Sequence, residues 1–153
     1  MHMAAASGKL DTIEKLIDLE AMVDFNDELD QKPIHLAAQN DHTNVVKKFL
    51  EIRPSLVSST TKDGNTLAHL AAKKGSVDVL QAMFDIDTAL VTQAKNRFNE
   101  NTPLHLATEG GHLEAVKIML VNGVSPNDEN KNGFTPVHLG TNQALSKQLS
   151  KSF

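Results

Sequence analysis

Histidine is the residue of this chain best suited to chemistry, and seven histidines occur among its 153 residues. An imidazole can bind a metal ion or transfer a proton near neutral pH. Five of the seven recur at intervals of 33, 34, 36 and 33 residues, at His2, His35, His69, His105 and His138. Such even spacing indicates a repeated structural element rather than one clustered site.

Each of these five histidines lies in a copy of one short motif, which reads T-P-L-H-x-A in its fullest form. That form runs from Thr102 to Ala107, and shorter or altered copies occupy residues 1–5, 33–38, 66–72 and 135–139. A period near 33 residues that carries this motif is the signature of the ankyrin repeat. The chain therefore resembles the ankyrin repeat family over residues 1–139. The resemblance implies an all-α solenoid of about four and a half stacked helix–turn–helix repeats, joined by short loops or hairpins.

The fourth copy shows why each repeat should fold as a pair of helices. Thr102 suits the N-cap position, and Pro103 suits the first helical position because its fixed φ and missing N–H cost nothing there. Gly111 supplies the left-handed turn that ends the first helix. Apolar residues then recur at helical spacing over 113–120, which predicts a second helix.

Several copies depart from this pattern. Lys32 takes the place of the N-cap threonine, which forfeits about 1 kcal/mol of capping free energy. Asp41 replaces the glycine between the two helices, while Asp30 and Glu100 replace the turn glycine before the motif. Gly140 occupies a position where alanine is expected, and the motif decays after it.

We expect one ankyrin repeat domain over 1–153, with repeats near 1–26, 27–60, 61–96, 97–129 and a partial or degenerate one at 130–153. A short helix is predicted over 144–153, with Leu145 and Leu149 facing inward. Because the chain begins inside a motif and lacks polar capping repeats, we expect it to be a fragment of a longer array.

Composition excludes several functional classes. A net charge of −4 and a pI near 5.9 argue against a nucleic-acid-binding protein, which normally carries a basic face. The absence of cysteine excludes disulfides and thiolate metal sites and favours a reducing, cytoplasmic setting. No apolar stretch is long enough to span a bilayer, so we expect no direct membrane insertion by this chain.

The sequence also predicts no enzyme, no catalytic residue, no cofactor and no metal site. Phosphate-binding, dinucleotide-binding, zinc-protease, nucleophile-elbow and EF-hand motifs do not occur. Histidines one repeat apart should lie about 10 Å apart, too far to share a metal ion. The resemblance to ankyrin repeats implies a structural role, in which motif histidines hydrogen-bond the neighbouring threonine and the backbone and so tie repeats together.

Two stretches suggest a closer relation within the family. The segment from Thr61 to Ala72, and the segments 99–112 and 125–131, resemble repeats of the NompC-type (TRPN) mechanosensitive channels. That resemblance implies an elastic cytoplasmic tether of an ion channel. Its partners would be the cytoskeleton, for example tubulin, or neighbouring ankyrin repeats.

Binding residues are expected on the concave side of the stack, which the hairpin tips and the first helices of the repeats line. The candidates are the residues in these places that the fold does not need. They are Glu28, Leu29, Gln31, Gln39, Asn40, Lys62, Asp63, Asn65, Lys73, Lys74, Phe98, Asn99, Asn101, Glu109, Lys131, Asn132 and Phe134. Phe98 and Phe134 are either anchors for a partner or packed against the next loop.

Three functional hypotheses remain open at this stage. The chain is part of a scaffold and elastic element, or a small adaptor or inhibitor that grips one globular protein through its groove, or the targeting arm of an enzyme encoded elsewhere. The full reading frame would discriminate among them. Many more repeats and a membrane segment would favour the first hypothesis, and a short frame would favour the second.

Overall fold

The computed structural model describes residues 1–140 and residue 151. Its helices are α1 (His2–Ala6), α2 (Leu10–Asp18), α3 (Pro33–Gln39), α4 (Thr43–Ile52), η1 (Pro54–Ser58), α5 (Leu67–Lys74), α6 (Val77–Ile86), α7 (Ala89–Thr92), α8 (Pro103–Glu109), α9 (Leu113–Val121) and α10 (Pro136–Leu139). The predicted all-α solenoid is confirmed. The helix predicted over 144–153 lies outside the described residues, apart from residue 151.

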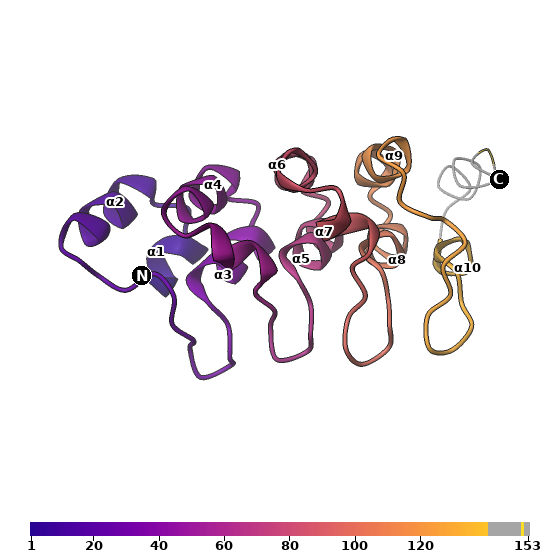
Figure 1. Cartoon of the computed structure of the whole chain (residues 1–153), viewed down its shortest axis with the longest axis horizontal. Coiled ribbons are helices and arrows are strands. Elements are labelled where there is room, and N and C mark those ends of the chain that lie inside the picture. Colours follow the sequence, from indigo (N-terminus) through magenta and orange to yellow (C-terminus); the bar gives the residue numbers. More distant parts are fainter. Residues whose placement is uncertain (141–150, 152–153) are drawn as a thin grey trace.

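The helices form two rows (Figure 1). Helices α1, α3, α5, α8 and α10 make an inner row, and α2, α4, α6 and α9 make a second row behind it. Hairpin loops project from the free side of the inner row. We number the helix pairs one to four (α1/α2, α3/α4, α5/α6 and α8/α9) and call the contacts between successive pairs the first, second and third junctions.

A continuous apolar core runs through all the junctions. Small alanines such as Ala38 and Ala72 allow the inner helices to approach closely, and Phe49, Leu80 and Met119 fill the space between the rows. Because each pair has apolar residues on two sides, no pair could bury its surface without a neighbour.

The expected starts of the inner helices are observed. Thr102 is the N-cap of α8, its hydroxyl accepts the His105 N–H at 3.4 Å, and Pro103 follows at the first helical position. Lys32 is the N-cap of α3 and makes no side-chain cap hydrogen bond, since an ammonium group has no acceptor. His35 Nδ1 still accepts the Lys32 backbone N–H at 3.1 Å, so half of the capping arrangement survives.

Non-glycine residues take the left-handed turns where the sequence lacks glycine. Asp41 has φ of 62°, close to the 72° of Gly111 at the equivalent turn. Asp30 and Glu100 have φ of 59° and 57° at the hairpin tips. The backbone path is therefore kept, and short or polar side chains bear the strain.

Two short helices were not predicted. Helix η1 follows α4 and helix α7 follows α6, so the second and third pairs have longer exits than the first. Pro54 marks the start of η1, and its preset φ was the available sequence signal.

Candidate functional site: the concave groove

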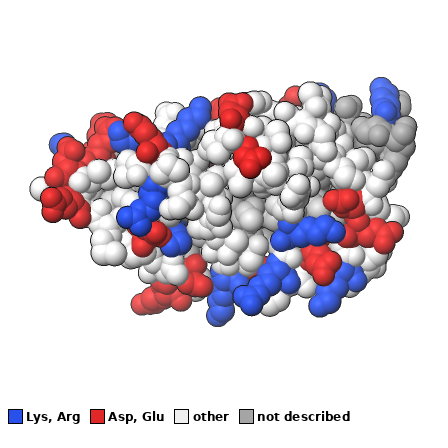
Figure 2. All heavy atoms as spheres, viewed as in Figure 1, with Lys and Arg blue, Asp and Glu red and all other residues white. Residues whose placement is uncertain are grey.

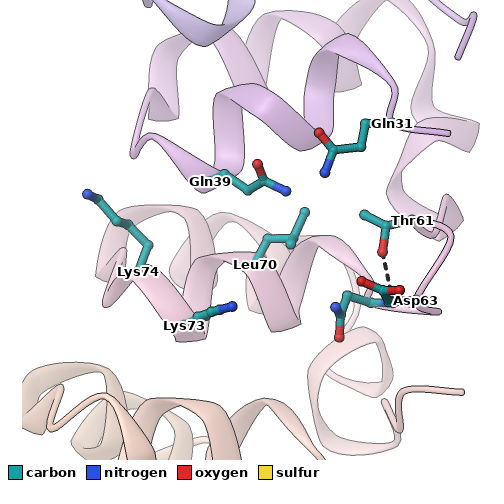
Figure 3. Close-up of a pocket in the computed structure, with 8 residues that line it drawn as sticks. Gln31, Gln39, Thr61, Asp63, Leu70, Lys73 and Lys74 are labelled. Atoms are coloured by element: carbon teal, nitrogen blue, oxygen red, sulfur yellow. Dashed lines mark hydrogen bonds between the residues drawn. The ribbon is translucent and has the colours of Figure 1, made fainter. Parts of the chain in front are cut away.

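A hollow of about 480 Å³ lies on the concave side where the second and third pairs meet (Figure 3). It is lined by Gln31, Gln39, Thr61, Asp63, Asn65, Leu70, Lys73 and Lys74. The hairpins that precede α3 and α5 supply one end of this lining, and the two helices supply the rest. The site therefore depends on stacking, because no single pair contains all of it.

A second hollow of about 270 Å³ continues the first toward the third junction. It shares Asp63, Asn65 and Lys73 with the first and adds Asn96, Phe98, Asn99 and Leu106. We call the two hollows together the concave groove. A groove that crosses two junctions suits an extended chain better than a compact small molecule.

The hairpins are held in shape by side-chain caps, which fix the rim of the groove. Asn96 Oδ1 accepts the Asn101 N–H at 3.2 Å, and Asn130 Oδ1 accepts the Phe134 N–H at 3.1 Å. In the hairpin that borders the first hollow, Thr61 Oγ1 accepts the Asn65 N–H at 3.3 Å, which is the bond drawn in Figure 3. Asx and Thr turns of this kind are local and so fold with the hairpin.

Polar groups of the groove are available for a ligand. Within residues 1–140 and 151, neither Lys73 nor Lys74 forms an ion pair, and the side chains of Gln31 and Gln39 have no hydrogen-bond partner. On the face shown in Figure 2, acidic side chains gather at the N-terminal end, and both signs alternate along the hairpin edge. Ammonium and amide groups in this arrangement can bind a carboxylate and a peptide backbone.

Many of the sequence-predicted residues fall in the concave groove. They are Gln31, Gln39, Asp63, Asn65, Lys73, Lys74, Phe98 and Asn99. The others line neither hollow: Glu28, Leu29, Asn40, Lys62, Asn101, Glu109, Lys131, Asn132 and Phe134. Phe98 is 60% exposed at the edge of the groove, whereas the 47% exposed Phe134 ring packs edge-on against His138.

One of these residues requires a correction. Asn101 was expected to be free for a partner, but it is 5% exposed. Its carbonyl accepts His69 Nε2 at 2.8 Å and its side-chain oxygen accepts Asn130 Nδ2 at 2.8 Å. The polarity of Asn101 serves the fold, because buried amides must be hydrogen-bonded.

Four lining residues were missed by the sequence argument: Thr61, Leu70, Asn96 and Leu106. Leu70 and Leu106 directly follow His69 and His105, whose rings turn into the core. The residue after the motif histidine therefore lies toward the groove. The helical spacing of the motif could have shown this.

The histidines connect successive pairs through both ring nitrogens. His69 Nδ1 accepts the Thr66 hydroxyl at 2.9 Å, and its Nε2 donates to the Asn101 carbonyl at 2.8 Å. Burial lowers the pKa of His69 to about 4, so the ring is neutral at pH 7 and carries its proton on Nε2. Both nitrogens of this neutral ring are therefore engaged in hydrogen bonds within the fold.

His105 makes the same bonds to Thr102 and to the Phe134 carbonyl, and burial lowers its pKa too. His42 and His112 donate in the opposite direction along the stack, to the carbonyls of Ala6 and Lys73. The structural role that the resemblance implied for the motif histidines is therefore observed at His69 and His105. Within the described ranges, no group of three or more His, Asp or Glu residues could hold a metal ion, and no helix is long and apolar enough to cross a membrane.

Comparison with known proteins agrees with this geometry. The family described as "Ankyrin repeats (3 copies)" matches residues 1–91 and 87–147. The chain is 31% identical over 123 residues to a Caenorhabditis elegans homologue of the transient receptor potential cation channel subfamily A member 1, covering 80% of this chain and 10% of the channel. It is 29% identical over 154 residues to human B-cell lymphoma 3 protein, covering 95% of this chain and 34% of that protein.

Human NF-kappa-B inhibitor zeta is a third relative, 23% identical over 112 residues, with 71% of this chain and 16% of the inhibitor covered. The chain thus spans between a tenth and about a third of the length of these relatives. Both channel and inhibitor proteins carry similar repeats, so the likeness extends to the repeat module and not to one activity.

Proposed function

Because the chain belongs to the ankyrin repeat family, we propose that it is a non-enzymatic protein-interaction module whose concave groove binds an extended segment of a partner protein. One observation carries the proposal. Lys73, Lys74, Gln31 and Gln39 line one hollow, and the described fold uses none of their side-chain polar groups.

The chemistry of the lining defines the partner segment. Two ammonium groups at the end of α5 favour a carboxylate, while Asp63 at the hairpin end disfavours one. The side-chain amides can donate to and accept from a peptide backbone, and Leu70 and Phe98 offer apolar contacts. We therefore propose a segment with an acidic residue near α5 and an apolar residue near Phe98.

A peptide-display selection on the full chain tests this. Selected peptides should be enriched in Asp and Glu, and Lys73→Glu with Lys74→Glu should weaken their binding by tenfold or more. Lys15→Glu with Lys47→Glu makes the same charge change on exposed positions of α2 and α4 and should leave binding unchanged. Equal loss in both variants, or no acidic enrichment, would refute the groove assignment.

For the parent protein we propose a cytoplasmic ankyrin array of a TRPN-like channel, serving as scaffold and elastic element. The resemblance of residues 61–72 to such repeats and the likeness to a channel homologue support it. Elasticity would follow from stacking, because each pair contacts only its neighbours and bending is distributed along the array. Pull-down of tubulin by a longer array is the test, and absence of binding would remove the tether.

The second candidate is a stand-alone adaptor or inhibitor. Its support is the match to B-cell lymphoma 3 protein over 95% of this chain and the match to NF-kappa-B inhibitor zeta. A partner would then be one globular protein that fills the groove. A full reading frame without membrane segments would favour this candidate over the channel.

A further inference from the structure

Three polar ties recur between neighbouring pairs of this array. The motif histidine donates forward to a carbonyl of the next hairpin, from His2 to Gln31 at 2.9 Å and from His69 to Asn101 at 2.8 Å. The histidine at the start of the second helix donates back to the previous inner helix, from His42 to Ala6 at 3.0 Å and from His112 to Lys73 at 2.8 Å.

The third tie is an amide pair between hairpins. Asn96 Nδ2 donates to Asn65 Oδ1 at 3.1 Å across the third junction. Asn130 Nδ2 donates to Asn101 Oδ1 at 2.8 Å across the next contact, between α8 and α10. The third junction thus has all three ties, which together restrain both the inner helices and the hairpins.

In the described part of the chain, the second junction has none of the three ties at the equivalent positions. His35 Nε2 donates to the Ser59 hydroxyl at 3.0 Å. Ser59 follows η1 and precedes the next hairpin, so this bond does not reach the hairpin itself. Ser76 occupies the position of His42 and His112, and Thr61 occupies that of Asn96. Within residues 1–140 and 151, the Ser76 hydroxyl is buried and has no hydrogen-bond partner, so this site has lost its bond without replacement.

Each back-donating histidine needs room that the second junction does not offer. A Cβ on Gly8 would lie 2.5 Å from the His42 ring, and one on Gly75 would lie 2.6 Å from the His112 ring. Asp41 stands at the equivalent turn of α3 with φ of 62°, so a Cβ is present where Gly8 and Gly75 have none. At the second junction, Ser76 and Asp41 therefore replace the histidine and the glycine that contact each other at the first and third junctions.

The hairpin tips show the same contrast. Gly64 is so close to the next hairpin that a Cβ there would lie 2.3 Å from Arg97 Cβ. Asp30 takes the equivalent position one hairpin earlier, and its carboxylate bonds Asn26 within its own loop. A side chain at Asp30 therefore replaces the glycine that lets the hairpin before α5 lie close to the hairpin before α8.

Hollows flank the second junction on both sides of the stack. The larger is the concave hollow of about 480 Å³, and one of about 330 Å³ lies between α4 and α6, lined by Lys47, Leu50, Glu51, Ala82, Asp85 and Ile86. Among the described residues, the apolar core is what joins the two pairs between these hollows. Apolar contact is non-directional, so it resists separation more than it resists rotation.

We propose that the second junction is the compliant joint of this array. Pairs one and two form one rigid block, pairs three and four form the other, and the blocks rotate about the α3–α5 contact. The rotation changes the width of the first hollow, because Gln31 and Gln39 move with one block while Lys73 and Lys74 move with the other. This rotation requires no partner and does not depend on the proposed groove ligand.

Distances between spin labels test the joint directly in the full chain. The chain has no cysteine, so labelled cysteines introduced at chosen sites are unambiguous. Labels at Lys47 and Gln81 span the second junction, and labels at Gln81 and Lys117 span the third at equivalent helix positions. We expect a distance distribution at least twice as broad across the second junction. Equal widths would overturn the proposal.

Exchanging the residues between junctions is the complementary test. Asp41→Gly, Ser76→His and Thr61→Asn together should narrow the distribution across the second junction. They should also slow amide hydrogen exchange in α3 and α4 by about fivefold for each restored hydrogen bond. Gly75→Asp, His112→Ser and Asn96→Thr should transfer the broad distribution to the third junction. No change of width in either exchanged chain would refute the assignment to these residues.

Discussion

The second and third junctions both lie within the continuous apolar core but differ in their polar contacts. The alanines of α3, α5 and α8 are buried, as are Ile34, Leu67 and Leu104. Across the third junction, His69, His112 and Asn96 donate to atoms of the neighbouring pair at 2.8–3.1 Å. Across the second, the equivalent positions are His35, Ser76 and Thr61, and none of them donates to the neighbouring pair within the described residues.

This difference separates two properties of a repeat array. Apolar burial sets which surfaces stack, since it scales with the area removed from water. Directional hydrogen bonds fix how the stacked pairs are oriented, each adding about 1 kcal/mol to stability. A chain can thus keep its fold at a junction while losing stiffness there.

Acid should produce the largest effect, because each of the two junctions contains a buried motif histidine. Burial lowers the pKa of both His35 and His69 to about 4, from an ordinary value of 6.5. The unfolded chain therefore binds more protons than the folded chain between these values, and the free energy of unfolding falls as pH falls from 6.5 toward 4. The two rings together should contribute a slope of up to about 3 kcal/mol per pH unit.

Urea denaturation at several pH values measures this slope. His35→Asn should reduce this slope by up to about 1.4 kcal/mol per pH unit, because one of the buried imidazoles is removed. A free energy of unfolding that stays constant from pH 7 to pH 4.5 would contradict the burial argument for both junctions.

Removing the motif histidine should distinguish the junctions directly. His69→Ala deletes a buried ring and an inter-pair hydrogen bond, and should lower the free energy of unfolding by about 3–4 kcal/mol. His35→Ala deletes an equally buried ring, but the hydrogen bond of that ring goes to Ser59 and does not reach the next hairpin. This substitution should therefore lower the free energy of unfolding by about 1 kcal/mol less than His69→Ala. Chemical denaturation at pH 7.5 gives both values. A larger loss for His35→Ala would reverse the proposed order of junction strength.

The sequence was sufficient for the repeated parts of the fold. The five spaced histidines gave the all-α solenoid, and Asp41, Asp30 and Glu100 were correctly identified as replacements for turn glycines. Their left-handed φ values confirm this. Such features are local, so residue type and spacing determine them.

Parts that depend on tertiary contacts were predicted less well. Asn101 carries the same polarity as an exposed hairpin residue, and only its place beneath the next hairpin buries it. Leu70 belongs to the buried core and also lines the groove, a double role that residue type does not reveal. The weak junction was also hidden, because Ser76 and Thr61 are unremarkable until their positions are aligned with His112 and Asn96 in space.

The back-donating histidine should make its glycine intolerant of a side chain. Gly75 has φ of 80°, and an added Cβ would meet the His112 ring at 2.6 Å. Gly75→Ala should therefore lower the free energy of unfolding by about 2 kcal/mol through strain and displacement of the ring. In a His112→Ser background the same substitution should cost about 1 kcal/mol, the part due to φ alone. Equal costs in both backgrounds would show that the ring does not impose the requirement.

The smallest expected effect comes from replacing two different serines by alanine, which should change the free energy of unfolding in opposite directions. The Ser59 hydroxyl accepts from His35 and donates to the Leu56 carbonyl at 2.6 Å, so Ser59→Ala should destabilise the chain by about 1 kcal/mol. The buried Ser76 hydroxyl has no partner in the described part of the chain, so Ser76→Ala should stabilise it by up to about 1 kcal/mol. Both substitutions remove one oxygen from a serine of the second junction, so the two variants differ only in the surroundings of the removed hydroxyl. Paired urea titrations measure the difference, and destabilisation by Ser76→Ala would show that the hydroxyl is satisfied and that this tie was replaced rather than lost.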